Sequence, residues 1–170
     1  MSLENFTKVL SWSNFPNPLP PGRPEEATIS VTWRLDADQF ERRGNAIMIG
    51  PYSVVIETVA AKCAVVKAIA NGDKAVSDGL LKHEQGHYDI IALGAREFYK
   101  KLSSLSGATE DELNGKWKKM DAELSQKADI VDARYDVATN HGKNAAVQRV
   151  WNLKIEAAKN NPNGTVIDLP

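Results

Sequence analysis

Three residues in one short stretch have the types and spacing that metal-dependent hydrolysis requires. Residues 83–87 read His-Glu-Gln-Gly-His, the pattern H-E-x-x-H, inside a segment whose apolar positions recur as in a helix. Residues four apart lie on one face of a helix, so His83 and His87 can bind one cation from the same side. Glu84 lies one position further round, where its carboxylate can act on a metal-activated water. The spacing predicts a zinc site of the metallopeptidase type, with Glu84 as general base.

The third zinc ligand has more than one candidate. A catalytic zinc usually has three protein ligands and one open position. His141 is the only other histidine of the chain and is the first candidate. If the helix that carries the motif forms a straight hairpin with the next one, however, Tyr135 and Asp136 come closer to the metal than His141 does. Asp136 is therefore the alternative ligand, or a carboxylate that accepts a hydrogen bond from a ligand histidine. Glu97, about four turns along the motif helix, is a weaker alternative.

Several neighbouring residues have both a functional and a structural interpretation. Tyr135 either donates a hydrogen bond to a developing oxyanion or packs in the core with its hydroxyl satisfied. Asp89 is expected to face solvent, and Gln148 and Trp151 are expected to be packing residues. Gly86 costs about 1 kcal/mol relative to alanine inside a helix. Its presence indicates that another segment of the chain passes close by.

The composition excludes some classes of protein. The chain has 170 residues, 42% of them hydrophobic and 25% charged, with a net charge of −1. These values are ordinary for one soluble globular domain and do not favour binding to nucleic acid or to an anionic membrane surface. Cys63 is the only cysteine, so we expect no disulfide and no cysteine-rich zinc site, and a core position for its thiol. No membrane span is expected, because Lys62 and Lys67 interrupt the most apolar region.

The chain is expected to consist of an arm and one domain. Residues 1–26 contain five prolines, which disfavour a regular interior element, so we expect an arm that wraps over the surface. Trp12 and Phe15 are the side chains that could fix this arm to the body. Residues 27–170 are then a single domain.

Strands are expected first in this domain. Residues 27–36 alternate between apolar and polar side chains, as in a half-buried strand. Residues 37–45 are polar and predict a loop or a short helical turn. Residues 46–49, 52–60 and 62–70 are expected to be further strands, which together would form an antiparallel sheet with one face in water.

Helices follow the strands. Ser77 is the expected N-cap of the first long helix, which carries the metal motif, and Thr109 with Glu112 forms a capping box for the second. Gly142 is expected in a C-terminal capping role, and residues 165–167 in a short strand. The three helices are expected at residues 78–104, from 110 to an end at 140–142, and at 144–159. Strands followed by helices predict the α+β class.

Three pieces of the sequence resemble a bacterial family catalogued as a domain of unknown function, DUF922, whose members are regarded as zinc-dependent proteases. Residues 80–89 match its L-L-x-H-E-x-x-H-[FY]-D. Residues 135–142, followed by Gln148 and Trp151, match its Y-D-x-x-T-x-H-G-x5-Q-x-x-W. Residues 12–15 match its W-x-x-F opening.

The resemblance implies a fold, an activity and a location. The family is grouped with the zincin-like metallopeptidases, so a zincin-like fold and hydrolysis of a peptide or protein substrate are implied. His83, His87 and His141 would hold Zn²⁺, with Glu84 as catalytic base. In zincins the substrate lies extended along an edge strand, for which residues 52–60 or 62–70 are the candidates. Family members are generally exported, which implies a periplasmic or secreted protein, although Met1-Ser2-Leu3-Glu4 does not read as a signal peptide.

A different class of function remains open from the sequence. A metal-stabilised binding module of the bacterial cell envelope would keep the histidine ligands for structure and would use the sheet or the arm for a partner. Such a module has no need of Glu84. Replacement of Glu84 by glutamine therefore distinguishes the two functions.

Overall fold

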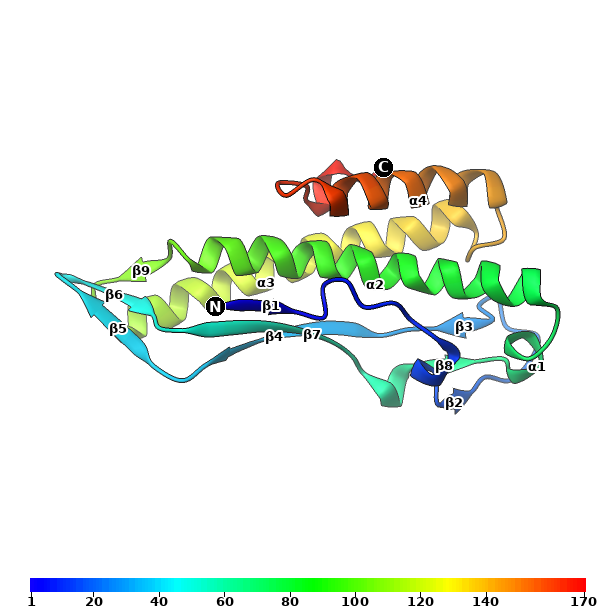
Figure 1. Cartoon of the computed structure of the whole chain (residues 1–170), viewed down its shortest axis with the longest axis horizontal. Helices are drawn as coiled ribbons and strands as arrows, with labels where there is room; N and C mark the ends of the chain where they lie inside the picture. The colour runs from blue at the N-terminus through cyan, green and yellow to red at the C-terminus, as the bar shows by residue number, and fades with distance from the viewer.

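Two long helices, α2 (Lys74–Leu102) and α3 (Glu110–Thr139), form the hairpin on which the protein is built. The computed structural model describes all residues 1–170 and shows α2 running along the length of the molecule, with small sheets on one side and α4 (Ala145–Asn160) on the other (Figure 1). A fourth helix, α1 (Lys67–Ala70), is a single turn before α2. The α+β class is confirmed, as are the three predicted helices. Residues 83–87 lie in α2, the first long helix.

Helix α2 begins four residues earlier than predicted. The side chain of Asp73, not Ser77, caps it, accepting hydrogen bonds from the backbone amides of Ala75 and Val76 at 2.9 and 3.1 Å. Ser77 lies in the first turn of the helix. Its hydroxyl accepts a hydrogen bond from the indole of Trp12 at 2.8 Å, so the predicted contact between Trp12 and the body is present.

The second helix has the predicted N-cap, half of the predicted capping box and an unusual end. The hydroxyl of Thr109 accepts a hydrogen bond from the amide of Glu112 at 3.2 Å, but the carboxylate of Glu112 accepts from the amide of Ala108 at 2.8 Å instead of from that of Thr109. At the other end the chain leaves α3 through three consecutive residues with left-handed backbone, Asn140, His141 and Gly142, at φ values of 50°, 52° and 79°. This conformation is costly for residues other than glycine. The turn reverses the chain into α4.

The longest strands form a mixed sheet beneath α2. Strand β7 (Tyr52–Thr58) lies between β1 (Ser2–Glu4), which is parallel to it, and β4 (Val31–Ala37), which is antiparallel. The expectation that residues 1–26 form no regular element is wrong for β1 and for the two-residue strand β2 (Asn17–Pro18). The residues of β1 precede the first proline, Pro16, so their backbone is free to pair.

Two smaller sheets close the ends of the molecule (Figure 1). One has the order β5-β6-β9, and the other has the order β2-β8-β3, with β8 parallel to β2 and antiparallel to β3. Their strands are β5 (Phe40–Arg43), β6 (Ala46–Ile49), β9 (Ser106–Gly107), β2 (Asn17–Pro18), β8 (Ala64–Val65) and β3 (Ala27–Thr28).

These sheets correct five local predictions. Residues 27–36 form two strands of different sheets, β3 and β4, instead of one strand. Residues 37–45 contain strand β5 of a hairpin instead of a loop or helical turn. Residues 62–70 contain the two-residue strand β8 and then α1 instead of one strand. The sheets are mixed instead of wholly antiparallel. Residues 166–168 form a 3₁₀ turn instead of a strand; two others span 12–14 and 60–62.

The core lies between α2 and the β1-β7-β4 sheet. Val54 and Ile56 of β7 and Leu93 of α2 are fully buried there, as is Phe15 of the N-terminal arm. Cys63 is a free, buried thiol, as predicted. None of the helices is both long enough and apolar enough to cross a membrane.

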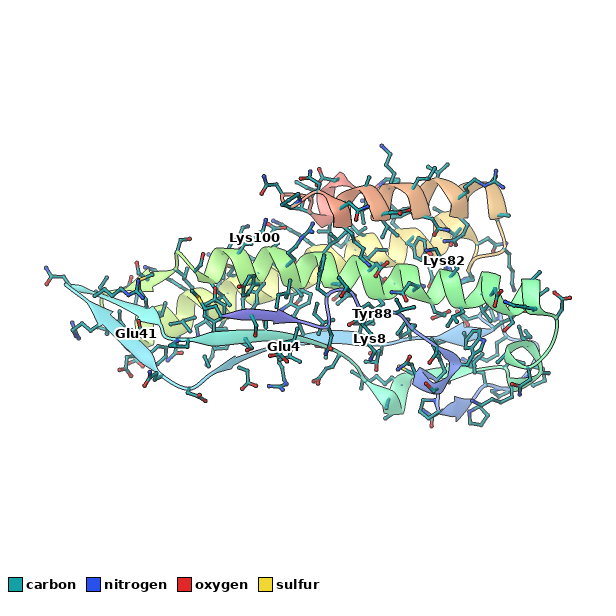
Figure 2. All side chains as sticks on the ribbon, in the orientation of Figure 1. Glu4, Lys8, Glu41, Lys82, Tyr88 and Lys100 are labelled. Carbon is teal, nitrogen blue, oxygen red and sulfur yellow. The ribbon has the colours of Figure 1, made fainter.

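The N-terminal arm is held by residues of the motif helix itself. Gln85 accepts a hydrogen bond from the amide of Leu10 at 2.8 Å and donates one to the carbonyl of Lys8 at 3.1 Å. The hydroxyl of Tyr88 donates to the carbonyl of Asn5 at 2.8 Å, and Lys8 and Tyr88 lie near each other in Figure 2. One face of α2 therefore holds the arm, and another carries the candidate site.

Candidate metal centre

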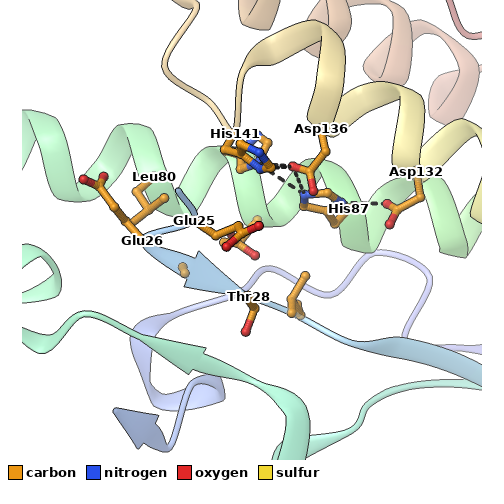
Figure 3. A pocket seen from close by; sticks show the side chains of 12 residues that line it. Glu25, Glu26, Thr28, Leu80, His87, Asp132, Asp136 and His141 are labelled. Carbon is orange, nitrogen blue, oxygen red and sulfur yellow. Dashed lines mark hydrogen bonds and ion pairs between the residues drawn. The ribbon is translucent and has the colours of Figure 1, made fainter. Parts of the chain in front are cut away.

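The two histidines of the motif meet one carboxylate of α3, and Figure 3 shows His87 beside Asp136. The Nε2 atoms of His83 and His87 lie 3.1 and 3.2 Å from Oδ1 of Asp136, and 3.2 Å from each other. Donor atoms around a tetrahedral zinc, with bonds of 2.0–2.1 Å, are about 3.3 Å apart. His83, His87 and Asp136 therefore form a group that could hold a metal ion, and their chemistry and spacing suit zinc.

The second ring nitrogen of His87 is hydrogen-bonded to a carboxylate that was not predicted from the sequence. Nδ1 of His87 lies 2.7 Å from Oδ1 of Asp132, one turn before Asp136 on α3. An ionised carboxylate only accepts hydrogen bonds, so Nδ1 of a neutral His87 carries the proton. Its Nε2 then has a free lone pair directed at the site. A carboxylate in this position orients a ligand histidine and raises its basicity.

A chain of hydrogen bonds fixes His83 in the same tautomer. The carbonyl of His83 can only accept, so the hydroxyl of Tyr135 donates to it, at 3.0 Å. The oxygen of Tyr135 accepts from the side-chain amide nitrogen of Gln148 at 2.6 Å. The other end of that amide, Oε1, lies 3.1 Å from Nδ1 of His83 and must accept its proton. Nε2 of His83 is left free for a cation. Gln148, which was expected only to pack, thus orients a histidine of the site.

Tyr135 is placed as a support for the histidines. It is fully buried, its ring stacks on that of His83 with 4.8 Å between centroids, and it meets the edge of Trp151. Its hydroxyl group already donates a hydrogen bond to the carbonyl of His83. This placement supports the packing interpretation over the oxyanion donor. A Cβ on Gly86 would lie 2.5 Å from Cζ of Tyr135, so the close approach predicted at Gly86 is present.

Glu84 lies beside this group with one oxygen unused. Its side chain is buried, and its Oε2 has no hydrogen-bond partner. Burial raises the pKa of Glu84 to about 7, although the nearby His87 opposes the shift. A carboxyl group whose pKa lies near neutrality can both take up and release a proton.

Hydrogen bonds shift the pKa values of Asp136 and His87. Burial alone would raise the pKa of Asp136, but in the absence of a cation its hydrogen-bonded contacts with Nε2 of His83 and Nε2 of His87 hold it well below its usual range. Burial would lower the pKa of His87, but the hydrogen bonds to Asp132 and Asp136 outweigh burial and raise it to about 10. In the absence of a cation, a proton therefore neutralises part of this negative cluster. A cation would compete with that proton.

The left-handed turn after α3 brings His141 to the edge of the site. Its Nδ1 lies 3.2 Å from Oδ1 of Asp136, but this nitrogen makes no hydrogen bond. The turn is tight: a Cβ on Gly142 would lie 3.0 Å from Cβ and Cγ of His83. His141 thus contacts Asp136 but is not in the group whose donor atoms all lie within 4.8 Å of one another.

A cavity of about 190 Å³ opens between the site and strand β3 (Figure 3). One wall is formed by α2 and α3, and the opposite wall by β3 with the residues that flank it. The lining residues are Glu25, Glu26, Ala27, Thr28, Ile29, Leu80, His83, Glu84, His87, Asp132, Asp136 and His141.

Two acidic candidates lie away from the site. Glu97 forms an ion pair with Lys101 at 2.7 Å. Asp89 is buried, against the prediction that it faces solvent, and pairs with Lys159 at 2.7 Å. Asp132 was missed, although the signal was in the sequence: it lies four residues before Asp136 and therefore on the same face of α3.

Comparison with known proteins agrees with the motifs. Residues 57–142, half of the chain, match the family described as "Bacterial protein of unknown function (DUF922)". The match runs from the end of β7 through α2 and α3 to the turn that carries His141. No curated protein and no solved structure matches the chain. The protein is therefore a member of the bacterial DUF922 family.

Proposed function

We propose that this protein is a zinc-dependent peptidase of zincin-like architecture. The observation that carries the proposal is the direction of the two histidine rings. Both Nδ1 atoms are bound to acceptors, Asp132 and Gln148, so both Nε2 atoms are free to face the same carboxylate oxygen. A helix surface with two unrelated histidines would have no reason for acceptors at both Nδ1 atoms.

The ligands we propose are His83, His87 and Asp136. Three protein ligands leave one position open, which is the arrangement of a catalytic and not of a structural zinc. A zinc ion in this position would supply a water that loses its proton near neutral pH and a positive charge close to the substrate carbonyl. His141, the first candidate from the sequence, would contact Asp136 at the rim.

Glu84 is the residue that makes a hydrolase the better proposal. Glu84 lines the same cavity, where its carboxyl group can accept a proton from water and deliver it to the leaving amine. A purely structural site does not explain a buried carboxyl group without a partner, because burying one is unfavourable.

Strand β3 favours a peptide as the substrate. It lies at the edge of the β2-β8-β3 sheet and lines the cavity, so an extended peptide could pair with its free side. The strands expected to supply this edge do not do so. β7 and β8 are each the central strand of their sheets.

The test combines zinc content with peptide turnover. Protein purified without chelator should contain about one zinc per chain. Glu84→Gln should keep the zinc and lose a factor of about 10²–10⁴ in turnover of a peptide library. Glu97→Gln, on the same helix but paired with Lys101, is the matched control and should keep both. Asp136→Ala should lose the zinc and His141→Ala should retain it.

Two results would contradict the proposal in different ways. Loss of zinc with His141→Ala alone would move the third ligand to the histidine. Zinc-loaded wild-type protein that cleaves no peptide, with a Glu84→Gln variant that behaves identically in every assay, would leave the metal-stabilised binding module of the cell envelope as the function.

A further inference from the structure

The cavity at the metal centre is lined by acidic side chains and contains no lysine or arginine. Five carboxyl groups face it: Glu25, Glu26, Glu84, Asp132 and Asp136. Asp132 and Asp136 are bound to the histidines, and Glu84 is assigned above to proton transfer. Glu25 and Glu26 have no such task.

Glu25 and Glu26 are half-buried and free of ion pairs. They immediately precede β3, and no lysine or arginine side chain lies within 4.0 Å of either carboxylate. Lys143 reaches this segment, but its ammonium group donates a hydrogen bond to the carbonyl of Pro24 at 2.8 Å. Figure 3 shows both glutamates beside the cavity, on the side opposite α3.

The backbone of β3 indicates where a bound peptide would lie. The carbonyl of Glu26 accepts a hydrogen bond from the amide of Val66, and the carbonyl of Val65 accepts one from Leu19 of the β2 side. Because hydrogen-bonded residues alternate in an antiparallel pair, the amide and carbonyl of Ala27 point away from β8, to the open edge. A peptide paired with Ala27 would have its side chains next to Glu25 and Glu26.

The charge of the cavity selects what can enter it. Even with Glu84 protonated, the other four carboxylates carry four negative charges, and a divalent cation supplies two positive charges, so an occupied site stays negative. Glu84, which lines the same cavity, is buried and has an Oε2 atom without a hydrogen-bond partner. An acidic substrate would be repelled, whereas a cationic one would be attracted.

We propose that the substrate is a peptide with a lysine or arginine next to the scissile bond, and that Glu25 and Glu26 select it. This inference rests on the peptidase proposed above and adds the class of substrate. The glutamates act on specificity, since they contact the substrate side chain and not the reacting atoms.

The test compares matched peptides that differ only by lysine, glutamine or glutamate at the positions flanking the scissile bond. With zinc-loaded protein, kcat/KM for the lysine peptide should exceed that for the glutamine peptide by about tenfold, because two partly exposed charge pairs each contribute a few-fold. The glutamate peptide should be the poorest. The lysine preference should shrink as salt concentration rises.

Variants assign the preference to the two glutamates. The double variant Glu25→Gln, Glu26→Gln should bring the lysine-to-glutamine ratio to within about twofold of one. Glu41→Gln, in the hairpin at the far end of the molecule (Figure 2), should keep the wild-type ratio. A wild-type ratio near one, or a ratio that the double variant leaves unchanged, would overturn the inference while the peptidase stands.

A binding measurement separates this inference from the peptidase proposal. Fluorescently labelled lysine and glutamine peptides are titrated with zinc-loaded Glu84→Gln protein, which binds without turnover. Tighter binding of the lysine peptide that is lost in the Glu25, Glu26 double variant supports the recognition of basic residues even if the wild type cleaves no peptide. Equal binding of both peptides overturns it.

Discussion

Replacing Gly86 by alanine tests how closely α2 and α3 approach at the metal centre. A Cβ at this position would lie 2.5 Å from Cζ and 2.9 Å from Cε1 of Tyr135, and nearer still to its hydroxyl. Carbon atoms need about 3.5 Å, so the tyrosine ring would have to move by about 1 Å. The ring is fully buried and is held between His83 and Trp151, so it has no free space to enter.

The size of the effect follows from three contributions. Overpacking of a buried ring costs about 1–3 kcal/mol. Displacing the Tyr135 hydroxyl from the His83 carbonyl costs about 1 kcal/mol more. Alanine in place of glycine inside a helix opposes these losses, because it stabilises the helix by about 1 kcal/mol. The expected net loss in the free energy of unfolding is about 2 kcal/mol, which lowers Tm by about 4–8 °C in a protein of this size.

The assay is thermal and urea unfolding of matched glycine variants. Gly79 on α2 and Gly115 on α3 are exposed, and a Cβ at either position would meet no atom within 4 Å, so alanine there should stabilise the protein by up to about 1 kcal/mol. Gly86→Ala should also weaken zinc binding, since Tyr135 supports both histidines. A Gly86→Ala protein as stable as Gly79→Ala would refute the close approach and the role assigned to Tyr135.

Three further predictions concern a helix cap, a histidine acceptor and a buried tyrosine. Asp73→Ala should lower the free energy of unfolding by about 1 kcal/mol in urea titrations, because two amides of α2 lose their acceptor. Gln148→Ala should weaken zinc affinity about 10–100-fold in competition with a chromogenic chelator, and Asn152→Ala, which contacts only the Gln148 amide, should change it little. Burial raises the pKa of Tyr52 to about 12 from an unfolded value near 10. The folded state therefore keeps the Tyr52 proton to higher pH than the unfolded state does. The contribution of Tyr52 to the free energy of unfolding is complete below pH 10 and is lost between pH 10 and 12, and this decrease should be less steep in Tyr52→Phe.

Local spacing was enough to predict the parts of the site that lie on helices. The i, i+4 pair His83 and His87 needs only helical geometry to converge. The equal path lengths of the two arms of an antiparallel hairpin also predicted that Asp136 lies level with the motif, and the structure places it there. Asp132 was available by the same argument, because one turn of α3 separates it from Asp136.

Non-local pairing explains what could not be predicted. The alternation over residues 27–36 predicted one strand, but no local pattern shows that Ala27 and Thr28 form a separate strand, β3, because Ala27 pairs with Val65, thirty-eight positions later. The same is true of β1, whose three residues pair with β7. The left-handed backbone at His141 could not be predicted either, because an asparagine and a histidine before Gly142 are also compatible with an ordinary helix end.

The contact between His83 and Asp136 joins positions 53 residues apart in a chain that has no disulfide. A cation bound there would act topologically as a cross-link that closes this loop and restricts the unfolded chain. For a covalent link, closing a loop of that length corresponds to about 4 kcal/mol of lost chain entropy. Unlike a disulfide, such a link is not broken by reduction and opens only when the cation is withdrawn. The resistance of the α2 and α3 hairpin to force and to proteases would therefore depend on the supply of the metal.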